Sequence, residues 1–174
     1  FYQKGTLTVG NRLVDQDEVD FAIVRGEHDP SLQTATRQLE SRRLAEDRLW
    51  LVMPEALELA HRKRIRLDHI AQAPLIGYPP TSATMKRIMR VLAPFGATPW
   101  IEVDRKAAAL AYVGAGLGIA FVSLVEDQRL EYKRVVVRNV TSLFPKMAFW
   151  LVWSTASTPS LTSWRRDFAD EIAA

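Results

Sequence analysis

Residues 113–122 read VGAGLGIAFV, with glycines at alternate positions between a helix-forming run and a short apolar run. A dinucleotide-binding glycine loop has the opposite order, because it follows a strand and opens a helix whose amides face a pyrophosphate. Here the preceding residues 105–112 (RKAAALAY) form the strongest helical segment of the chain. The glycines are therefore predicted to end that helix and lead into a buried strand at 119–122. This excludes a nucleotide loop and indicates an α/β fold that binds small molecules in a cleft.

Short apolar runs predict seven strands. Runs such as 21–24 (FAIV) are typical of strands buried on both faces of a parallel sheet. Because helical segments lie between the runs, we expect an α/β fold with a mostly parallel sheet. The predicted strands are residues 21–24, 49–53, 75–76, 101–103, 119–122, 134–140 and 147–153.

Two further helices carry capping signals. Thr81 or Ser82 is expected to cap a helix that ends near Pro94 and buries Met85, Ile88, Met89 and Leu92. The last helix is expected to have Thr158 as its N-cap and Pro159 at its first position. Its predicted buried stripe comprises Leu161, Trp164 or Arg165, Phe168 and Ile172.

Composition excludes several classes of function. The 174 residues contain no cysteine, which excludes disulfides and thiolate chemistry, and no apolar run is long enough to span a bilayer. The three histidines lack metal-ligand spacing, and Ser123 lacks the surroundings of a nucleophile elbow, so we expect neither metal, cofactor nor catalysis. The net charge is +3, and the basic clusters at 42–43, 62–66, 105–106 and 165–166 are short and scattered. Solvated helix faces are the favoured interpretation of these clusters.

Taken together, five segments resemble the effector-binding domain of LysR-type transcriptional regulators. They lie in the expected order along nearly the whole chain: VDFAIVRG (19–26), LAEDRLWLVM (44–53), IRLDHIAQAPLI (65–76), VGAGLGIAFV (113–122) and FWLVW (149–153) with the terminal helix. The resemblance implies a two-lobed, type-2 periplasmic-binding-protein-like α/β fold with two crossover hinge strands. Residues 1–50 and 151–174 would form lobe I, whose first strand and helix are missing, and residues 51–150 would form lobe II.

The resemblance also implies a set of ligand-binding residues in a cleft between the lobes. Ligands of open α/β sheets lie beyond the carboxyl ends of strands, where helix N-termini favour anions. The candidates carried over from the family are Thr6, Arg25, Tyr78, Thr81, Ser82, Arg105 and Ser123.

Each candidate has a structural alternative. Thr81 and Ser82 could simply cap their helix, and the same ambiguity holds for Thr6. Arg25 could form an ion pair with a lobe I carboxylate, and Tyr78 could serve packing alone. Asp104 followed by Arg105 could be an N-cap and a solvent-facing charge.

The function implied is that of a cytoplasmic sensor, not an enzyme or a membrane protein. A small anionic effector, such as a carboxylate, would favour one arrangement of the lobes in a homodimer or homotetramer. DNA would be bound only through an N-terminal helix-turn-helix domain that this sequence lacks. The alternative is a periplasmic solute-binding protein of a transporter, which would have the same fold.

Overall fold

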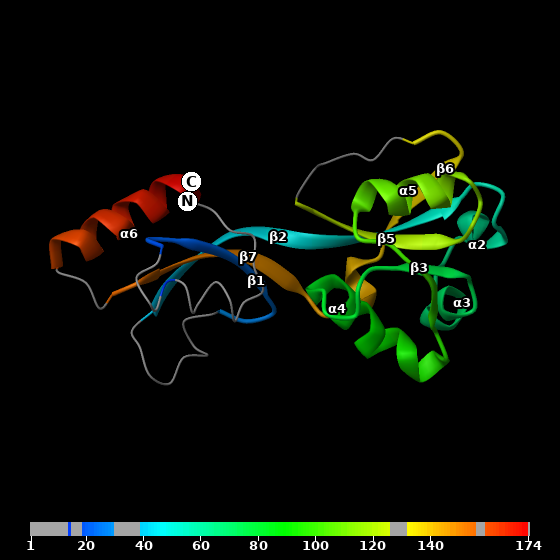
Figure 1. The fold of residues 1–174 in the computed structure, drawn as a ribbon, viewed down its shortest axis with the longest axis horizontal. Coiled ribbons are helices and arrows are strands. Elements are labelled where there is room, and N and C mark those ends of the chain that lie inside the picture. Colours follow the sequence, from blue (N-terminus) through cyan, green and yellow to red (C-terminus); the bar gives the residue numbers. More distant parts are fainter. Residues whose placement is uncertain (1–13, 15–18, 30–38, 126–131, 156–158, 174) are drawn as a thin grey trace. The chain divides into compact units, whose positions relative to one another are not determined.

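The computed structural model describes residues 14, 19–29, 39–125, 132–155 and 159–173 (Figure 1). The elements are β1 (Ala22–Gly26), β2 (Leu39–Pro54), α2 (Glu58–His61), α3 (Leu67–Ala71), β3 (Leu75–Gly77), α4 (Ala83–Leu92), β4 (Pro99–Glu102), α5 (Lys106–Gly114), β5 (Ile119–Val125), β6 (Val135–Asn139), β7 (Met147–Ser154) and α6 (Pro159–Ala173). Strands and helices alternate from β3 to β5, and 3-10 turns lie at Ala93–Phe95 and Thr141–Leu143.

The chain divides into two compact units. Unit 1 comprises Phe1–Asp47 and Met147–Ala174, and unit 2 comprises Arg48–Lys146. The chain therefore passes from one unit to the other twice, once within β2 and once where β7 begins. Strand β2 therefore contributes residues to both units, whereas β7 lies wholly in unit 1.

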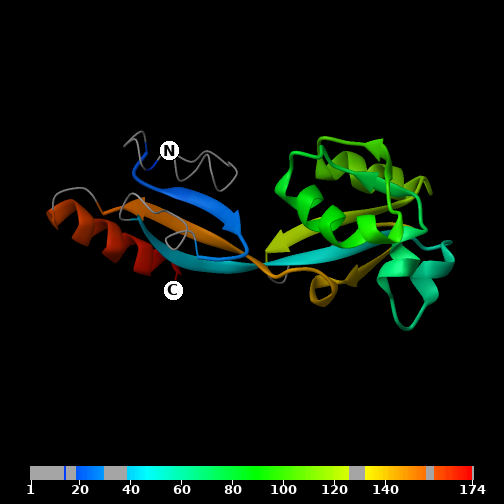
Figure 2. The same ribbon diagram turned by 90° about the horizontal axis from the view of Figure 1, so that it is seen from below.

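In unit 1, β7 lies between β1 and β2 and pairs antiparallel with both. Val24 and Val152 belong to a small apolar core on one face of these strands. Helix α6 lies along the strands, and Ala169 packs with Leu151 and Trp153 of β7 (Figure 2). One face of these three strands thus carries a small apolar cluster, and α6 packs against the other face.

The buried face of α6 differs from the predicted stripe. Trp164, Phe168 and Ile172 are exposed by 51%, 36% and 48%, whereas Arg165 is only 6% exposed. The Arg165 guanidinium occupies the inner position because it donates to Ser154 O (3.0 Å) and to a carboxylate oxygen of Asp20 (2.8 Å). The apolar side chains are displaced to the flank, where Trp164 and Phe168 contact the ring of Phe21. Of the predicted stripe, Phe168 and Ile172 are therefore wrong, and of the two alternatives Trp164 and Arg165 it is Arg165 that is buried. The side chain of Leu161 lies outside the described residues.

In unit 2, the sheet runs in the order β2-β5-β3-β4, and β6 pairs with β2. Strand β3 pairs parallel with both β4 and β5, whereas β6 pairs antiparallel with β2. The prediction of a mostly parallel sheet thus holds for the centre of unit 2 but is wrong for the β1–β7, β2–β7 and β2–β6 pairs, which are antiparallel. Apolar runs report burial on two faces, and they carry no information on strand direction.

Two apolar layers cover the two faces of the unit 2 sheet. Helix α4 contributes Met85, Ile88 and Leu92 to one layer, together with α2 and α3. Helix α5 supplies the opposite layer, where Ala109, Leu110 and Val113 are buried. Along β5 the residues alternate between the layers, as expected for a strand buried on both sides. The prediction of a buried strand at residues 119–122 is confirmed.

The glycine segment forms the predicted helix end. Helix α5 ends at Gly114, and Leu117 N donates to Tyr112 O (3.0 Å) while Gly116 takes a left-handed φ of 81°. Gly118 follows with φ 151°, and Ile119 N donates to Pro74 O (2.8 Å). A Cβ atom at Gly118 would lie 2.3 Å from that same carbonyl oxygen. Glycine at this position is therefore required by the start of the β3–β5 pairing.

We predict that Gly118→Ala destabilises the protein by about 2–4 kcal/mol, because the new methyl group meets backbone and the residue keeps a strained φ. Gly114→Ala is the matched control: no atom lies within 4 Å of its added Cβ. Alanine at this helical position should stabilise by about 0.5–1 kcal/mol. Urea unfolding of both variants tests the prediction, and an equal effect of the two substitutions would contradict it.

Candidate functional site

Most of the predicted ligand residues lie at the carboxyl edge of the unit 2 sheet. The backbone N–H of Val103 donates to Gly77 O (2.9 Å), which brings the ends of β4 and β3 together. Tyr78 directly follows β3, and Arg105 comes two residues after Val103. In chain order β3 leads to β4 on one side, and the chain then crosses to β5 on the other side of β3. Such a reversal is where open α/β sheets bind ligands.

Ser82 caps helix α4. Its hydroxyl accepts a hydrogen bond from Met85 N (3.1 Å), and its extended backbone conformation is typical of an N-cap. Thr81 is exposed in the preceding turn. Of the two neighbouring hydroxyls, that of Ser82 satisfies its own helix, whereas that of Thr81 faces solvent beside the positive end of the helix dipole.

Tyr78 is half-buried between the two apolar layers of unit 2, where it packs against both. This burial raises the pKa of its phenol from 10 to about 12. The side chain therefore stays neutral throughout the physiological range and offers a hydroxyl as donor or acceptor, but not a phenolate.

Arg105 and Ser123 lie on opposite faces of the sheet. Arg105 is the N-cap residue of α5, and its side chain is 82% exposed beside Asp104, with 3.6 Å between Nε and the carboxylate. Asp104 makes no capping bond, so the expected N-cap role of Asp104 is wrong. Ser123 is half-buried on β5, and strand alternation places it on the side of Phe121, the face that α4 covers.

Arg25 lies on β1 in unit 1 and forms an ion pair with Asp47 (3.5 Å). Asp47 is 1% exposed, whereas Arg25 is 18% exposed. A buried carboxylate needs such a partner, so the structural alternative proposed for Arg25 is present. Thr6 lies outside the described residues.

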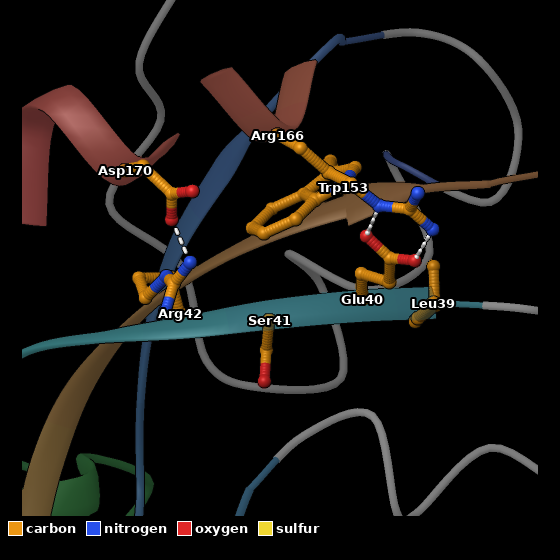
Figure 3. Close-up of a pocket in the computed structure, with 7 residues that line it drawn as sticks. All are labelled: Leu39, Glu40, Ser41, Arg42, Trp153, Arg166 and Asp170. Carbon is orange, nitrogen blue, oxygen red and sulfur yellow. Dashed lines mark hydrogen bonds and ion pairs between the residues drawn. The ribbon is translucent and has the colours of Figure 1, made fainter. Parts of the chain in front are cut away.

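A pocket of about 340 Å³ in unit 1 was not predicted (Figure 3). Two ion pairs, Arg166–Glu40 and Arg42–Asp170, cross it from α6 to β2. Ser41 points away from α6, and its hydroxyl donates to Asp29. Glu40 and Arg42, the residues on either side of it, point toward α6, as expected from the alternation of side chains along a strand. The signal in the sequence was complementary spacing: opposite charges two residues apart on the strand and four apart on the helix.

The charges of this pocket neutralise one another. Arg166 Nε donates to a carboxylate oxygen of Glu40 at 2.7 Å, and the hydrogen bonds from Arg166 lower the pKa of Glu40. Trp153 of β7 lies directly opposite Glu40 of β2 in the pairing of these two strands. We therefore assign these residues to holding α6 against the sheet.

Two absences apply to the part of the chain that the structure describes. No group of His, Asp or Glu side chains there is arranged to hold a metal ion. No helix in that part is both long and apolar enough to cross a membrane.

Comparison with known proteins gives one family. The family model described as the LysR substrate binding domain matches residues 6–173. No curated protein matches the chain in sequence.

Several solved structures share the fold. One is the C-terminal domain of a probable LysR family transcriptional regulator from Rhodococcus sp. RHA1 (22% identity, 98% of this chain and 82% of that one, TM-score 0.71). Another is the effector-binding domain of QuiR in complex with shikimate (21%, 97% and 78%, TM-score 0.68). A third is full-length CbnR complexed with its target DNA (15%, 98% and 58%, TM-score 0.68).

We predict that Ser82→Ala destabilises the protein by about 1 kcal/mol, because the N–H of Met85 loses its acceptor. Thr81→Ala, one residue earlier and exposed, should change the free energy of unfolding by less than about 0.5 kcal/mol. Chemical denaturation of both variants tests this assignment. A larger loss for Thr81→Ala than for Ser82→Ala would show that the cap is misassigned.

The pair between Glu40 and Arg166 predicts a pH-dependent contribution to stability. A carboxyl group whose pKa is lower when folded adds stability above its unfolded pKa, here the ordinary 4.5, and this is lost as the pH falls through its folded pKa. Glu40→Gln should therefore lower the thermal midpoint at pH 7, with the gap closing below about pH 4.5. Thermal melts from pH 7 to pH 3 measure it, with Glu102→Gln, on an exposed position of β4, as the control. A gap independent of pH would contradict the assignment.

Proposed function

Because the chain belongs to the LysR substrate-binding domain family, we propose that it is the effector-sensing domain of a LysR-type transcriptional regulator. The observation that carries this proposal is the family match over residues 6–173. The effector is a small anion such as a carboxylate. The matching family favours this function over the alternative, a periplasmic solute-binding protein of a transporter.

The carboxyl edge of the unit 2 sheet supports an anionic effector. Helix α4 begins there with the positive end of its dipole and with backbone amides that its own turns do not use. Thr81 and Arg105 add an exposed hydroxyl and a guanidinium. A carboxylate is suited to such donors, whereas a cation is not. The bound shikimate of QuiR, a small carboxylic acid, belongs to the same ligand class.

Tyr78 and Ser123 complete the proposed unit 2 contribution. Tyr78 stays neutral and offers its hydroxyl, and Ser123 lies on the sheet face that carries the start of α4. Unit 1 is proposed to contribute Thr6 and Arg25. Arg25 would serve the effector while it neutralises Asp47, since a guanidinium has five N–H donors.

Sensing requires that the effector bind the two states of the domain with different affinity. We propose that residues of both units, as lobes with boundaries near 50 and 150, contact the effector and so favour one state. The output would be the arrangement of DNA-binding helix-turn-helix domains in a cytoplasmic homodimer or homotetramer. These domains would be attached N-terminal to the segment described here.

The test is a thermal-shift screen of aromatic, aliphatic and amino acids. A true effector at about 100 times its Kd stabilises the folded state by about 2.7 kcal/mol, which raises the midpoint of a chain of this size by roughly 5–10 °C. The double variant Thr81→Ala/Arg105→Ala should lose this shift but keep its midpoint without effector, because both side chains are exposed. Alanine at Arg25 is a poor test, since it leaves Asp47 buried without this partner.

Thr98→Ala/Lys146→Ala is the matched control, because it also removes an exposed threonine and an exposed cation of unit 2. This control should retain the full shift. An undiminished shift in Thr81→Ala/Arg105→Ala would refute the site, and the absence of a stabilising acid across the screen would refute the anionic effector class.

A further inference from the structure

A basic surface in unit 2 belongs neither to the proposed effector site nor to the core. Four of its residues, Arg62, Lys63, Arg64 and Arg66, form the connection between α2 and α3, and all four are exposed. The others are the exposed cations Lys133 and Arg134, directly before β6, and Arg138, near its end. These seven residues are called the basic surface below.

Backbone contacts bring the two segments of the basic surface together. The guanidinium of Arg138 donates to Ala60 O in α2 (3.3 Å). Glu55 N donates to Arg134 O (2.9 Å), and the β2–β6 register continues from there to Trp50 opposite Asn139. Figure 1 shows α2 and β6 at the same end of unit 2. Two segments about 70 residues apart in the sequence thus present one set of cations.

Within the two described segments that form this surface, the basic side chains outnumber the acidic ones. Residues 55–68 and 132–138 carry seven basic and three acidic side chains, a net charge of +4, whereas the whole chain has +3. Two of the acids, Glu58 and Asp68, pair with Arg62 and Arg66. Pairs as exposed as these are weak, and a phosphate can replace the carboxylate. From the sequence, the 62–66 cluster is interpreted as a solvated helix face. That interpretation does not take into account the cations at 133, 134 and 138, which are far away in the sequence.

We propose that the basic surface binds the phosphate backbone of duplex DNA, irrespective of base sequence. Five of its seven cations are arginines, whose planar guanidinium matches phosphate oxygens in a bidentate manner. Duplex DNA presents closely spaced phosphates, and neutralising them releases counterions, so a few such contacts give measurable binding. The proposed function places DNA beside this domain in the assembled regulator, and in that respect the inference rests on it.

Two other partners fit less well. Binding of single-stranded nucleic acid relies on aromatic side chains that stack with bases, and the two segments contain one exposed aromatic residue, Tyr132. An acidic protein partner would normally contact an apolar centre within the charged rim. Between the cations of the α2–α3 connection the apolar residue is Ile65, which packs against the unit 2 core.

The experiment is fluorescence anisotropy of a labelled 20-base-pair duplex titrated with the full chain, without effector. The wild type should bind with a Kd on the order of 10 µM at about 50 mM salt and roughly 100-fold more weakly at about 200 mM, as expected for about four phosphate contacts. Duplexes of different sequence should bind equally.

Lys63→Glu/Arg64→Glu should weaken binding at least about 10-fold and reduce the salt slope by about 2, because two phosphate contacts are lost. Lys86→Glu/Lys106→Glu is the matched control with the same charge change. Its residues are exposed in the first turns of α4 and α5, where glutamate is compatible with the helix dipole. At about 0.1 M salt this control should stay within about 3-fold of wild type, because charges more than about 10 Å away are screened.

Thermal melts show whether each variant is folded, and Lys63→Gln/Arg64→Gln replaces the glutamate variant if that one is not. No binding at about 50 mM salt, or equal weakening by the test and control variants, would overturn the proposal. So would displacement of DNA by polyglutamate at equal charge, since the surface would then recognise carboxylates of an acidic protein. The DNA titrations contain no effector, so their result does not depend on whether the domain binds one. Failure of the proposed function would appear only in the thermal-shift screen.

Discussion

The main-chain hydrogen bonding of β2 is the interaction on which the rest of the structure depends. Its first part, residues 39–47, pairs with β7 in unit 1, and its last part, residues 50–54, pairs with β6 in unit 2. Between them, Leu49 O accepts from Val140 N, and Leu49 N donates to the Thr141 hydroxyl. One strand therefore pairs in both units, and its side chains enter a core in each: Leu39 in unit 1, and Leu49, Leu51 and Met53 in unit 2.

The sequence predicted the strands well where burial is apolar and poorly where it is ionic. All seven apolar runs fall on or overlap strands of the structure. The prediction for β2 covered only 49–53, because residues 39–48 (LESRRLAEDR) contain six charged side chains. Three charged positions from Glu40 to Asp47 form ion pairs, with Arg166, Asp170 and Arg25, and the hydroxyl of Ser41 donates to Asp29. Helices α2 and α3 are too short for a periodic pattern, so they could not be predicted.

The candidate site was predictable to the extent that it follows from strand ends. Tyr78, Thr81 and Ser82 follow β3 directly, and Arg105 follows the end of β4 by a few residues, so their common edge is a consequence of a parallel pair. Which hydroxyl caps the helix and which faces solvent depends on backbone conformation at a single residue, which residue type alone does not specify. The ligand roles of these residues remain predictions. The pocket beneath α6 was missed because its ion pairs join residues more than a hundred positions apart.

The inner face of α6 has a consequence for how this helix is oriented. An apolar stripe allows a helix to roll on its sheet, because dispersion contacts change little with small rotations. Arg165 removes that freedom, since a rotation by one residue, about 100°, would take its guanidinium away from both Ser154 O and Asp20. The azimuth of the helix is thus set by directional polar contacts. Replacing this arginine with leucine would improve the amphipathic pattern of the helix. It would also remove the contacts that fix the rotation of the helix about its own axis.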